Sequence, residues 1–224
     1  MNELALFAGA GGGLLASKQL GWRTVCAVEQ ESYAASVLMQ RQNDGLLEAF
    51  PIWDDVCTFD GRPWRGIVDV VSGGFPCQDI SVAGHQQGLQ AERSGLWSHF
   101  ARLVSELRPE VVFVENVANL LAGPTGNKGQ WFGRILGDLA EIGYDYMWLP
   151  SPCKAPTGQG TKWGNVGYNL YDRFDLGDIP QRGSLATRYG TRGSLRNMVD
   201  QAHHCDVKII PDIIMNHNGN GPDF

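Results

Sequence analysis

The sequence lacks the features that mark a membrane protein or a disulfide-stabilised secreted domain. No apolar run in its 224 residues reaches the length of a membrane-spanning helix. The N-terminal residues show no positively charged segment followed by an apolar stretch, as a secretory signal would. The five cysteines are odd in number and none are spaced C-x-x-C, which argues against a disulfide framework and against a zinc site. We therefore expect a cytoplasmic protein without a membrane partner.

The sequence also lacks an excess of positive charge. Its formal net charge is −6, with 10 basic and 17 acidic side chains in residues 1–146 and 8 and 7 in residues 147–224. Neither part is a basic patch, which counts against strong binding of nucleic acid by the chain as it stands. The apolar fraction of 43% can support a core, and the length fits one large domain or two small ones.

Short apolar runs alternate with helical patterns over the first two thirds of the chain, which predicts a parallel, doubly wound α/β sheet. In the helix expected after the second strand, Tyr33, Val37 and Leu38 are predicted to face the core. Ligands of such sheets bind at the carboxyl ends of the strands. The expected strands are 4–7, 24–28, 50–53, 67–71 and 111–114, and the expected helices begin at residue 14 and span 32–42, 94–107 and 129–142.

Glycines and acidic residues follow these expected strands. Gly9–Gly13 come between the first strand and a helix, where backbone N–H groups can meet a nucleotide-like ligand. Glu29 ends the second strand, where a carboxylate can accept hydrogen bonds from ribose hydroxyls; capping the next helix is the alternative role. Asp55 follows the third strand as an adenine-contacting residue would, and Glu115 follows the fifth.

Cys77 follows the fourth expected strand and a pair of glycines. A thiol on a loop at the end of a buried strand is placed as a nucleophile would be. Free cysteine is also among the residue types most often buried for packing alone. The segment Val71–Ser81 does not decide between these two roles by itself. The features at the neighbouring strand ends favour the nucleophile.

Several segments, in this order, resemble the successive motifs of the DNA (cytosine-5) methyltransferases. The similarity covers roughly residues 3–146 and implies a Rossmann-like fold that uses S-adenosylmethionine. The matching segments are Phe7-Ala-Gly-Ala-Gly-Gly12, Glu29, Asp55-Val56, Gly74-Phe-Pro-Cys-Gln78, Arg93-Ser-Gly-Leu-Trp97 and Glu115-Asn-Val117.

The resemblance also implies roles for individual residues. Cys77 would add to C6 of a cytosine that is flipped out of DNA, and Glu115 would hydrogen-bond the ring. Gln78 and Asn116 would contact the same substrate. The residues implied to bind S-adenosylmethionine are Phe7, Gly9, Gly11, Gly12, Glu29, Asp55, Val56, Pro76 and Leu96.

Beyond residue 146 the sequence resembles a different family, the N-terminal part of an α-amylase-type (β/α)8 barrel. The resemblance implies calcium binding by Asn216 and sugar contact by His217, without the catalytic carboxylates that lie on later strands of that family. A helix is expected over 195–204 and a strand over 207–210. The similar segments are Trp148–Pro152, Gly167–Gly177, Thr187–Thr191 and Asp212–His217.

The chain therefore reads as a chimera of two domains with a junction near Gly143–Trp148. Residues 1–146 would form a cofactor-binding catalytic domain without the later motifs of its family, and residues 147–224 a βα fragment. The fragment's apolar strand residues must pair with a neighbour, and adding a strand to the first sheet is one solution.

The expected function is transfer of a methyl group from S-adenosylmethionine to C5 of cytosine through a Cys77 adduct. We expect this activity to be weak or absent, because the target-recognition region does not follow residue 146. One alternative is a non-catalytic fold that binds S-adenosylmethionine. The other is an inactive amylase fragment that binds carbohydrate or calcium.

Overall fold

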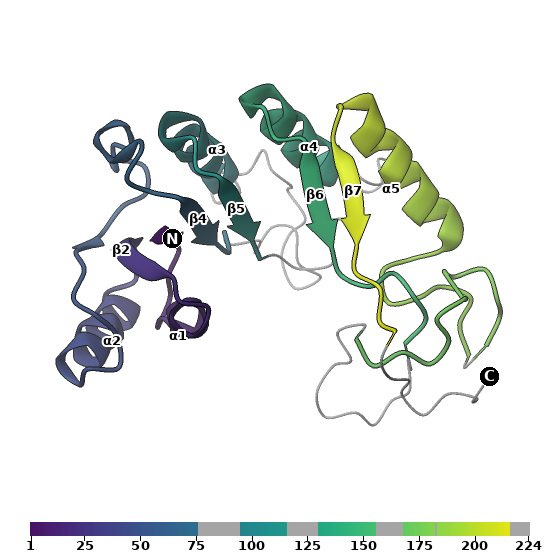
Figure 1. The fold of residues 1–224 in the computed structure, drawn as a ribbon, viewed down its shortest axis with the longest axis horizontal. Coiled ribbons are helices and arrows are strands. Elements are labelled where there is room, and N and C mark those ends of the chain that lie inside the picture. Colours follow the sequence, from purple (N-terminus) through teal and green to yellow (C-terminus); the bar gives the residue numbers. More distant parts are fainter. Residues whose placement is uncertain (76–94, 116–129, 156–167, 182, 216–224) are drawn as a thin grey trace. The chain divides into compact units, whose positions relative to one another are not determined.

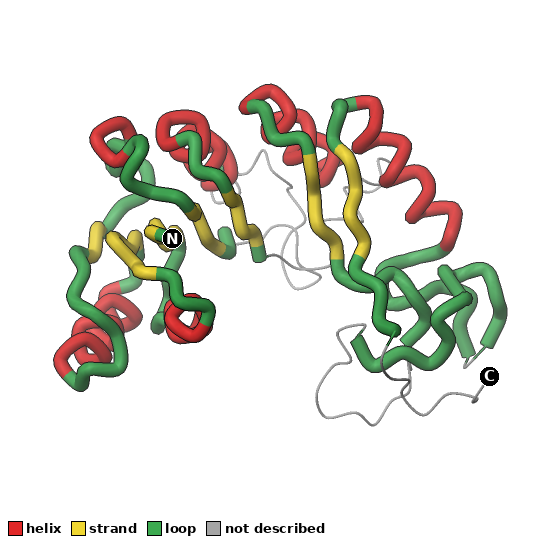
Figure 2. Tube along the Cα trace, in the orientation of Figure 1, coloured by secondary structure: helices red, strands yellow, loops and turns green. Residues whose placement is uncertain are grey.

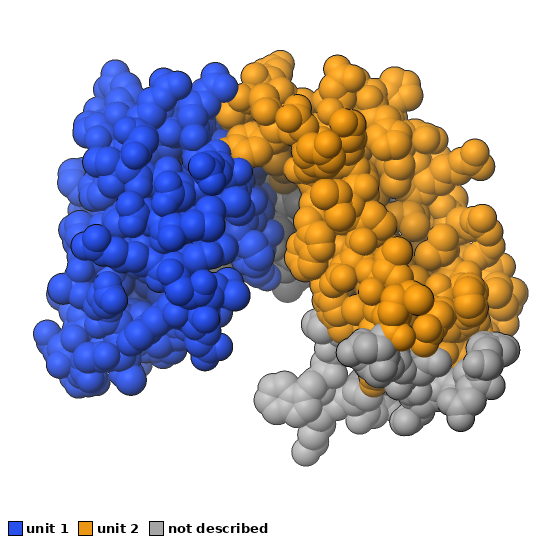
Figure 3. Space-filling model, in the orientation of Figure 1, with its two compact units in different colours: residues 1–132 blue, residues 133–224 orange. Residues whose placement is uncertain are grey.

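The structure is a computed structural model of the whole chain. It describes residues 1–75, 95–115, 130–155, 168–181 and 183–215. The chain divides into two compact units, residues 1–132 and residues 133–224 (Figure 3). Each unit has its own sheet.

The first unit contains a five-stranded parallel sheet with strand order β3-β2-β1-β4-β5. The chain adds strands on one side of β1 and then crosses to the other side for β4 and β5. This reversal is the topological switch point of a doubly wound sheet, and it confirms the α/β fold expected from the sequence. The strands are β1 (Asn2–Leu6), β2 (Arg23–Val28), β3 (Ile52–Trp53), β4 (Val70–Gly73) and β5 (Val111–Val114).

Helices cover both faces of this sheet. Figure 1 shows α1 and α2 on one side of the strands and α3 on the other. This arrangement follows from right-handed crossovers that run in opposite directions from β1. The elements are α1 (Gly12–Gln19), α2 (Ser32–Asn43), the short 3-10 helix η1 (Arg62–Trp64) and α3 (Leu96–Leu107).

The core of the first unit lies on the central strands and on the apolar face of α3. Residues Leu4 to Leu6 of β1 and Val70 and Val71 of β4 are almost wholly buried, as expected for strands covered on both faces. The buried stripe of α3 recurs at helical spacing. It consists of Trp97, Phe100, Leu103, Val104 and Leu107.

The second unit contains a two-stranded parallel sheet. The strand β7 (Lys208–Pro211) pairs with β6 (Tyr146–Leu149), which gives the apolar C-terminal strand its partner. The helices are α4 (Gln130–Ile142), whose first residues belong to the first unit, and α5 (Arg192–His204). Figure 2 shows the described chain between β6 and α5 as loop.

Some local expectations are wrong. Tyr33 is 74% exposed, because it lies about 140° around α2 from the fully buried Leu38. The fourth strand begins only at Val70 and continues into Gly73, since Gly73 pairs with Leu6 and with Val114. Among the residues that the structure describes, no helix combines the length and apolar character needed to cross a bilayer.

Candidate functional site

The sheet of the first unit ends in one row of residues at its carboxyl edge. Leu6 of β1 pairs with Val28 on one side and with Gly73 on the other, and the pairing continues to Trp53 of β3 and Val114 of β5. The residues that follow directly include four that the sequence singled out. They are Phe7, Glu29, Gly74 and Glu115.

The turn after β1 has an unusual backbone. Phe7 stands at φ 54°, in a region that residues with a side chain seldom adopt. Such outliers recur at functional sites, where the surrounding structure holds them in place. Gly11 caps α1 at φ 81° without a side-chain hydrogen bond, so the first N–H groups of the helix have no side-chain acceptor at the cap. A Cβ added at Gly9, Gly12 or Gly13 would meet no atom within 4 Å, which leaves this side of the turn open.

The Glu29 carboxylate links the second strand to the glycine turn. Its Oε2 accepts a hydrogen bond from the Gly9 N–H at 2.6 Å, and its Oε1 accepts one from the Glu31 N–H at 2.8 Å. The side chain does not cap α2, because Glu31 accepts the N–H groups of Tyr33 and Ala34. Each Glu29 oxygen retains a second lone pair, so the fixed carboxylate can accept further hydroxyl donors.

Asp55 begins a tight turn after β3. Its Oδ1 accepts the Cys57 N–H at 2.8 Å, and its carbonyl oxygen accepts the N–H groups of Thr58 and Phe59 at 3.1 and 3.2 Å. Val56, which follows, is buried. The turn therefore has a defined conformation at the same edge of the sheet as Glu29.

The ends of β4 and β5 meet closely. The Glu115 N–H donates to the Gly73 carbonyl oxygen at 3.1 Å. A Cβ on Gly74 would lie 2.7 Å from Glu115 Oε2, so the glycine permits this approach of carboxylate and backbone. Phe75, the last described residue before the cysteine loop, packs against Trp97 with ring centroids 5.4 Å apart. Leu96 begins α3 beside that tryptophan.

Several expected site residues lie outside the described residues: Pro76, Cys77, Gln78 and Asn116. Three cysteines within the described residues, Cys26, Cys57 and Cys153, have thiols that are poor nucleophiles at neutral pH. Burial raises the pKa of Cys26 to about 11. Cys57 is exposed, and its pKa is raised by partial desolvation and by the hydrogen bond and negative charge of the nearby Asp55 carboxylate. Burial also raises the pKa of Cys153. These three thiols are therefore mostly protonated at neutral pH.

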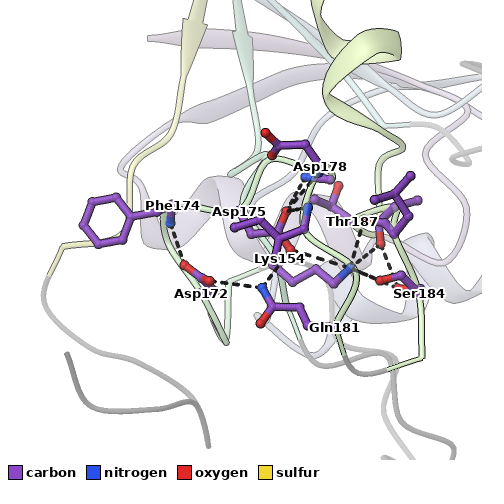
Figure 4. Close-up of polar contacts among 12 residues, drawn as sticks. Lys154, Asp172, Phe174, Asp175, Asp178, Gln181, Ser184 and Thr187 are labelled. Atoms are coloured by element: carbon purple, nitrogen blue, oxygen red, sulfur yellow. Dashed lines mark hydrogen bonds and ion pairs between the residues drawn. The ribbon is translucent and has the colours of Figure 1, made fainter.

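The second unit has a buried polar cluster that sequence reasoning missed (Figure 4). Lys154 is fully buried, and its Nζ donates to the carbonyl oxygens of Ser184, Leu185 and Ala186 at 2.8 to 3.1 Å. Oδ2 of the Asp175 carboxylate lies 3.8 Å from Lys154 Nζ. The segment Gly167–Gly177, which resembles the α-amylase family, includes Asp175, but nothing in the sequence marked Lys154.

Hydrogen bonds keep Asp175 ionised within this cluster. Burial acts to raise its pKa, but hydrogen bonds from the Gln181 side chain and from the N–H groups of Gly177, Asp178 and Ile179 together lower the pKa below its ordinary value. The cluster therefore ties residues 154, 172–181 and 184–186 of this loop together through hydrogen bonds and buried charge.

The described residues contain no group of three or more His, Cys, Asp or Glu side chains able to hold a metal ion. The two residues for which calcium or sugar contact was expected, Asn216 and His217, lie outside the described residues.

Comparison with known proteins finds two families along the chain. Residues 1–154 match the family described as C-5 cytosine-specific DNA methylase, and residues 127–224 match the α-amylase catalytic domain. The two matches overlap over residues 127–154, which include the expected junction. Both resemblances seen in the sequence are confirmed.

Curated relatives show the same division. The type II methyltransferase M.Eco47II of Escherichia coli is 37% identical over 140 residues, which cover 61% of this chain and 32% of the relative. M.Bsp6I of Bacillus sp. (strain RFL6) is 32% identical over 179 residues, covering 79% of this chain and 48% of the relative. An α-amylase of Bacillus licheniformis is 38% identical over 96 residues, covering 42% of this chain and 18% of the relative.

The chain thus spans between about a third and a half of the methyltransferases named above, and less than a fifth of the amylase. The methylase match covers more than half of the chain and includes every strand of the five-stranded sheet. This protein belongs to the C-5 cytosine-specific DNA methylase family and carries an α-amylase-like segment in its C-terminal part.

Proposed function

We propose that the first unit binds S-adenosylmethionine along the β3-β2-β1 edge and presents Cys77 and Glu115 to a cytosine at the ends of β4 and β5. The observation that supports this proposal best is the contact between Gly74 and the Glu115 carboxylate. It joins the segment that carries the nucleophile to the segment that carries the acid. Both segments follow neighbouring strands, β4 and β5, at the carboxyl edge where such sheets bind their ligands, and β4 borders the switch point beside β1.

The residues at this edge fit the proposed cofactor. The fixed Glu29 carboxylate suits the ribose hydroxyls. The open glycine turn and the start of α1, whose cap Gly11 makes no side-chain hydrogen bond, suit a close approach of the ligand to the backbone. Asp55 and Val56 would contact the adenine. Phe7, Gly9, Gly11, Gly12, Pro76 and Leu96 would complete the pocket.

When bound, S-adenosylmethionine would supply an electrophilic methyl group. The Cys77 thiolate would add to C6 of cytosine, which makes C5 nucleophilic. Glu115 would hydrogen-bond N3 and the exocyclic amine and so stabilise the charge that develops. After the methyl transfer to C5, loss of the C5 proton and elimination of the thiolate from C6 would restore the aromatic ring. Gln78 and Asn116 would hold the flipped base.

We propose that methyl transfer by this chain is weak. The match to the methylase family model ends at residue 154, and the α-amylase match runs to residue 224, where a methyltransferase would carry the segments that read DNA bases. The net charge of −6 adds a repulsive term toward the phosphate backbone. Because all four described cysteines are free thiols, we place the protein in a reducing compartment, the cytoplasm.

The experiment is transfer of a radiolabelled methyl group from S-adenosylmethionine to cytosine-containing DNA. The wild-type chain is compared with Cys77→Ala and with Cys205→Ala, a free thiol outside the methylase match. We expect a low rate for wild type and Cys205→Ala and none above background for Cys77→Ala. Equal label from all three proteins would contradict the assigned nucleophile.

Calorimetric titration with S-adenosylmethionine tests the cofactor site separately. Binding by the wild type and by Cys77→Ala, with no transfer by either, would establish the alternative function of a non-catalytic cofactor-binding fold. Absence of binding to the folded wild-type chain would overturn the proposal as a whole.

A further inference from the structure

Arg102 of α3 holds the turn that follows Asp55. Its Nη2 donates to the Val56 carbonyl oxygen at 2.9 Å, and its Nη1 donates to the Phe59 carbonyl oxygen at 3.0 Å. One guanidinium group therefore spans the turn at two points. Arginine suits this task because its donors have a fixed planar geometry.

Glu106, one helical turn further along α3, completes the attachment. Its Oε1 accepts from Arg102 Nη1 at 2.9 Å, and its Oε2 accepts from the Gly61 N–H at 2.9 Å. A Cβ on Gly61 would lie 2.9 Å from that same Oε2 and 3.2 Å from a Leu103 methyl group. The segment Val56–Gly61 thus lies tightly against the helix.

This attachment bears directly on Asp55. The carbonyl oxygen of Asp55 accepts N–H groups from Thr58 and Phe59, and its Oδ1 accepts the Cys57 N–H. The orientation of the carboxylate is therefore set by the same turn that Arg102 fixes. A shift of the turn would move Asp55 from its place after β3, at the same edge of the sheet as Glu29.

We propose that Arg102 and Glu106 are positioning residues for the adenine side of the cofactor pocket, acting through Asp55. The inference rests on the proposed function, because that function assigns Asp55 to the cofactor. It goes further in assigning a ligand-directed role to a charged pair outside the residues expected to contact the cofactor.

The plainer role would be an ion pair on a helix surface, and the chain offers a matched example. Arg134 and Asp138 on α4 have the same spacing of four residues, with 3.8 Å between the charged groups and side chains 49% and 31% exposed. Arg102 and Glu106 lie at 2.9 Å and are 33% and 20% exposed. Such surface pairs contribute little on their own. Arg134→Met is therefore the control for removal of an ordinary helical ion pair.

The test is a double-mutant cycle on affinity for S-adenosylmethionine, measured by calorimetry on the full chain. Arg102→Met removes the donors, and Asp55→Asn keeps an acceptor for the Cys57 N–H while removing the charge. We expect each single change to weaken binding about tenfold. The double variant should be no more than about twofold weaker than the worse single variant, because both changes disable one contact.

A second cycle separates positioning from general loosening of the fold. Arg102→Met combined with Glu29→Gln should show losses that multiply, since these residues share no contact. Arg134→Met should bind as wild type does. Arg102→Lys should recover only part of the affinity, because an ammonium group cannot span both carbonyl oxygens.

The outcomes are distinguishable. The positioning role is overturned, and the cofactor site stands, in either of two cases. The losses of affinity caused by Arg102→Met and Asp55→Asn multiply in the double variant, or Arg102→Met binds S-adenosylmethionine normally while Asp55→Asn binds it more weakly. If the wild type does not bind, or Asp55→Asn binds normally, the proposed function itself fails at this residue. If Arg102→Met does not fold, Glu106→Gln and Gly61→Ala take its place in both cycles, and the same criteria apply.

Discussion

Glu29 illustrates how one side chain can shape a site before any ligand arrives. Its two oxygens accept N–H groups from Gly9 and Glu31, which belong to the turns after β1 and β2. The carboxylate therefore fixes the glycine turn relative to the second strand. A ligand that uses its remaining lone pairs meets an acceptor that is already oriented.

Replacing Glu29 with Gln is expected to weaken S-adenosylmethionine binding by about tenfold. A glutamine has one acceptor oxygen, so one of the two N–H groups would face an NH2 group, at a cost of about 1–3 kcal/mol. Calorimetry at neutral pH measures the affinity, and Glu48→Gln on the exposed surface is the control. Unchanged affinity in Glu29→Gln would remove this carboxylate from the site.

Two adjacent glycines should respond differently to alanine. A Cβ at Gly73 would meet the backbone oxygen of Leu6 at 2.5 Å, whereas a Cβ at Gly74 would meet the mobile end of the Glu115 side chain. We expect Gly73→Ala to lower the free energy of unfolding by about 2–3 kcal/mol and Gly74→Ala by less than about 1 kcal/mol. Urea denaturation measures both, and equal losses would contradict the packing described for β1 and β4.

The position of a residue could be predicted where the residue directly follows an apolar strand. It could not be predicted where the residue acts through a contact with a part of the chain far away in the sequence. The sequence could place Glu29 at a strand end because apolar runs locate the strand. It could not reveal Arg102, since an arginine four residues before a glutamate is also the pattern of a solvated helix surface. Only the approach of Val56 and Phe59 to α3 distinguishes the two.

At the scale of elements, the parallel sheet was predictable because strand and helix patterns alternate and crossovers have a fixed hand. Boundaries were less so. The third strand was expected over residues 50–53 but spans only Ile52–Trp53, because only Ala27 and Val28 of β2 pair with it. The loop of the second unit was not predictable, because a buried lysine and a buried aspartate take part in holding it, and no periodic pattern in the sequence marks Lys154 and Asp175 as buried.

The loop of the second unit should be sensitive to acid. The folded pKa of Asp175 is lowered, so its contribution to stability is present above the ordinary carboxyl pKa of about 3.9 and is lost as pH falls through the folded value. Asp175→Asn should lower the free energy of unfolding by about 3 kcal/mol at neutral pH. It should also reduce the fall in melting temperature that the wild type shows as the pH is lowered.

The measurement for this prediction is the melting temperature of the second unit from pH 6 to pH 3. The control is Asp200→Asn, an exposed carboxylate on α5, which should leave the profile unchanged. A wild-type profile as flat as that of Asp175→Asn would show that the buried carboxylate contributes nothing.

At the scale of the whole molecule, two compact units with separate sheets should unfold in two steps. S-adenosylmethionine at 100 times its Kd should stabilise the first unit by about 2.7 kcal/mol and leave the second unchanged. Differential scanning calorimetry resolves the steps. Gly73→Ala should shift only the first transition and Lys154→Met only the second, and a single transition shifted by both would refute independent units.

The stretch that both families match, residues 127–154, contains α4 and β6. A helix followed by a parallel strand is a repeating piece of a doubly wound sheet and also of a (β/α)8 barrel, and it has the same hand in both. A junction inside such a piece keeps the order and the hand of the helix and the strand on both sides. Segments of the two families can therefore be joined within α4–β6 without reversing the connection that either architecture uses.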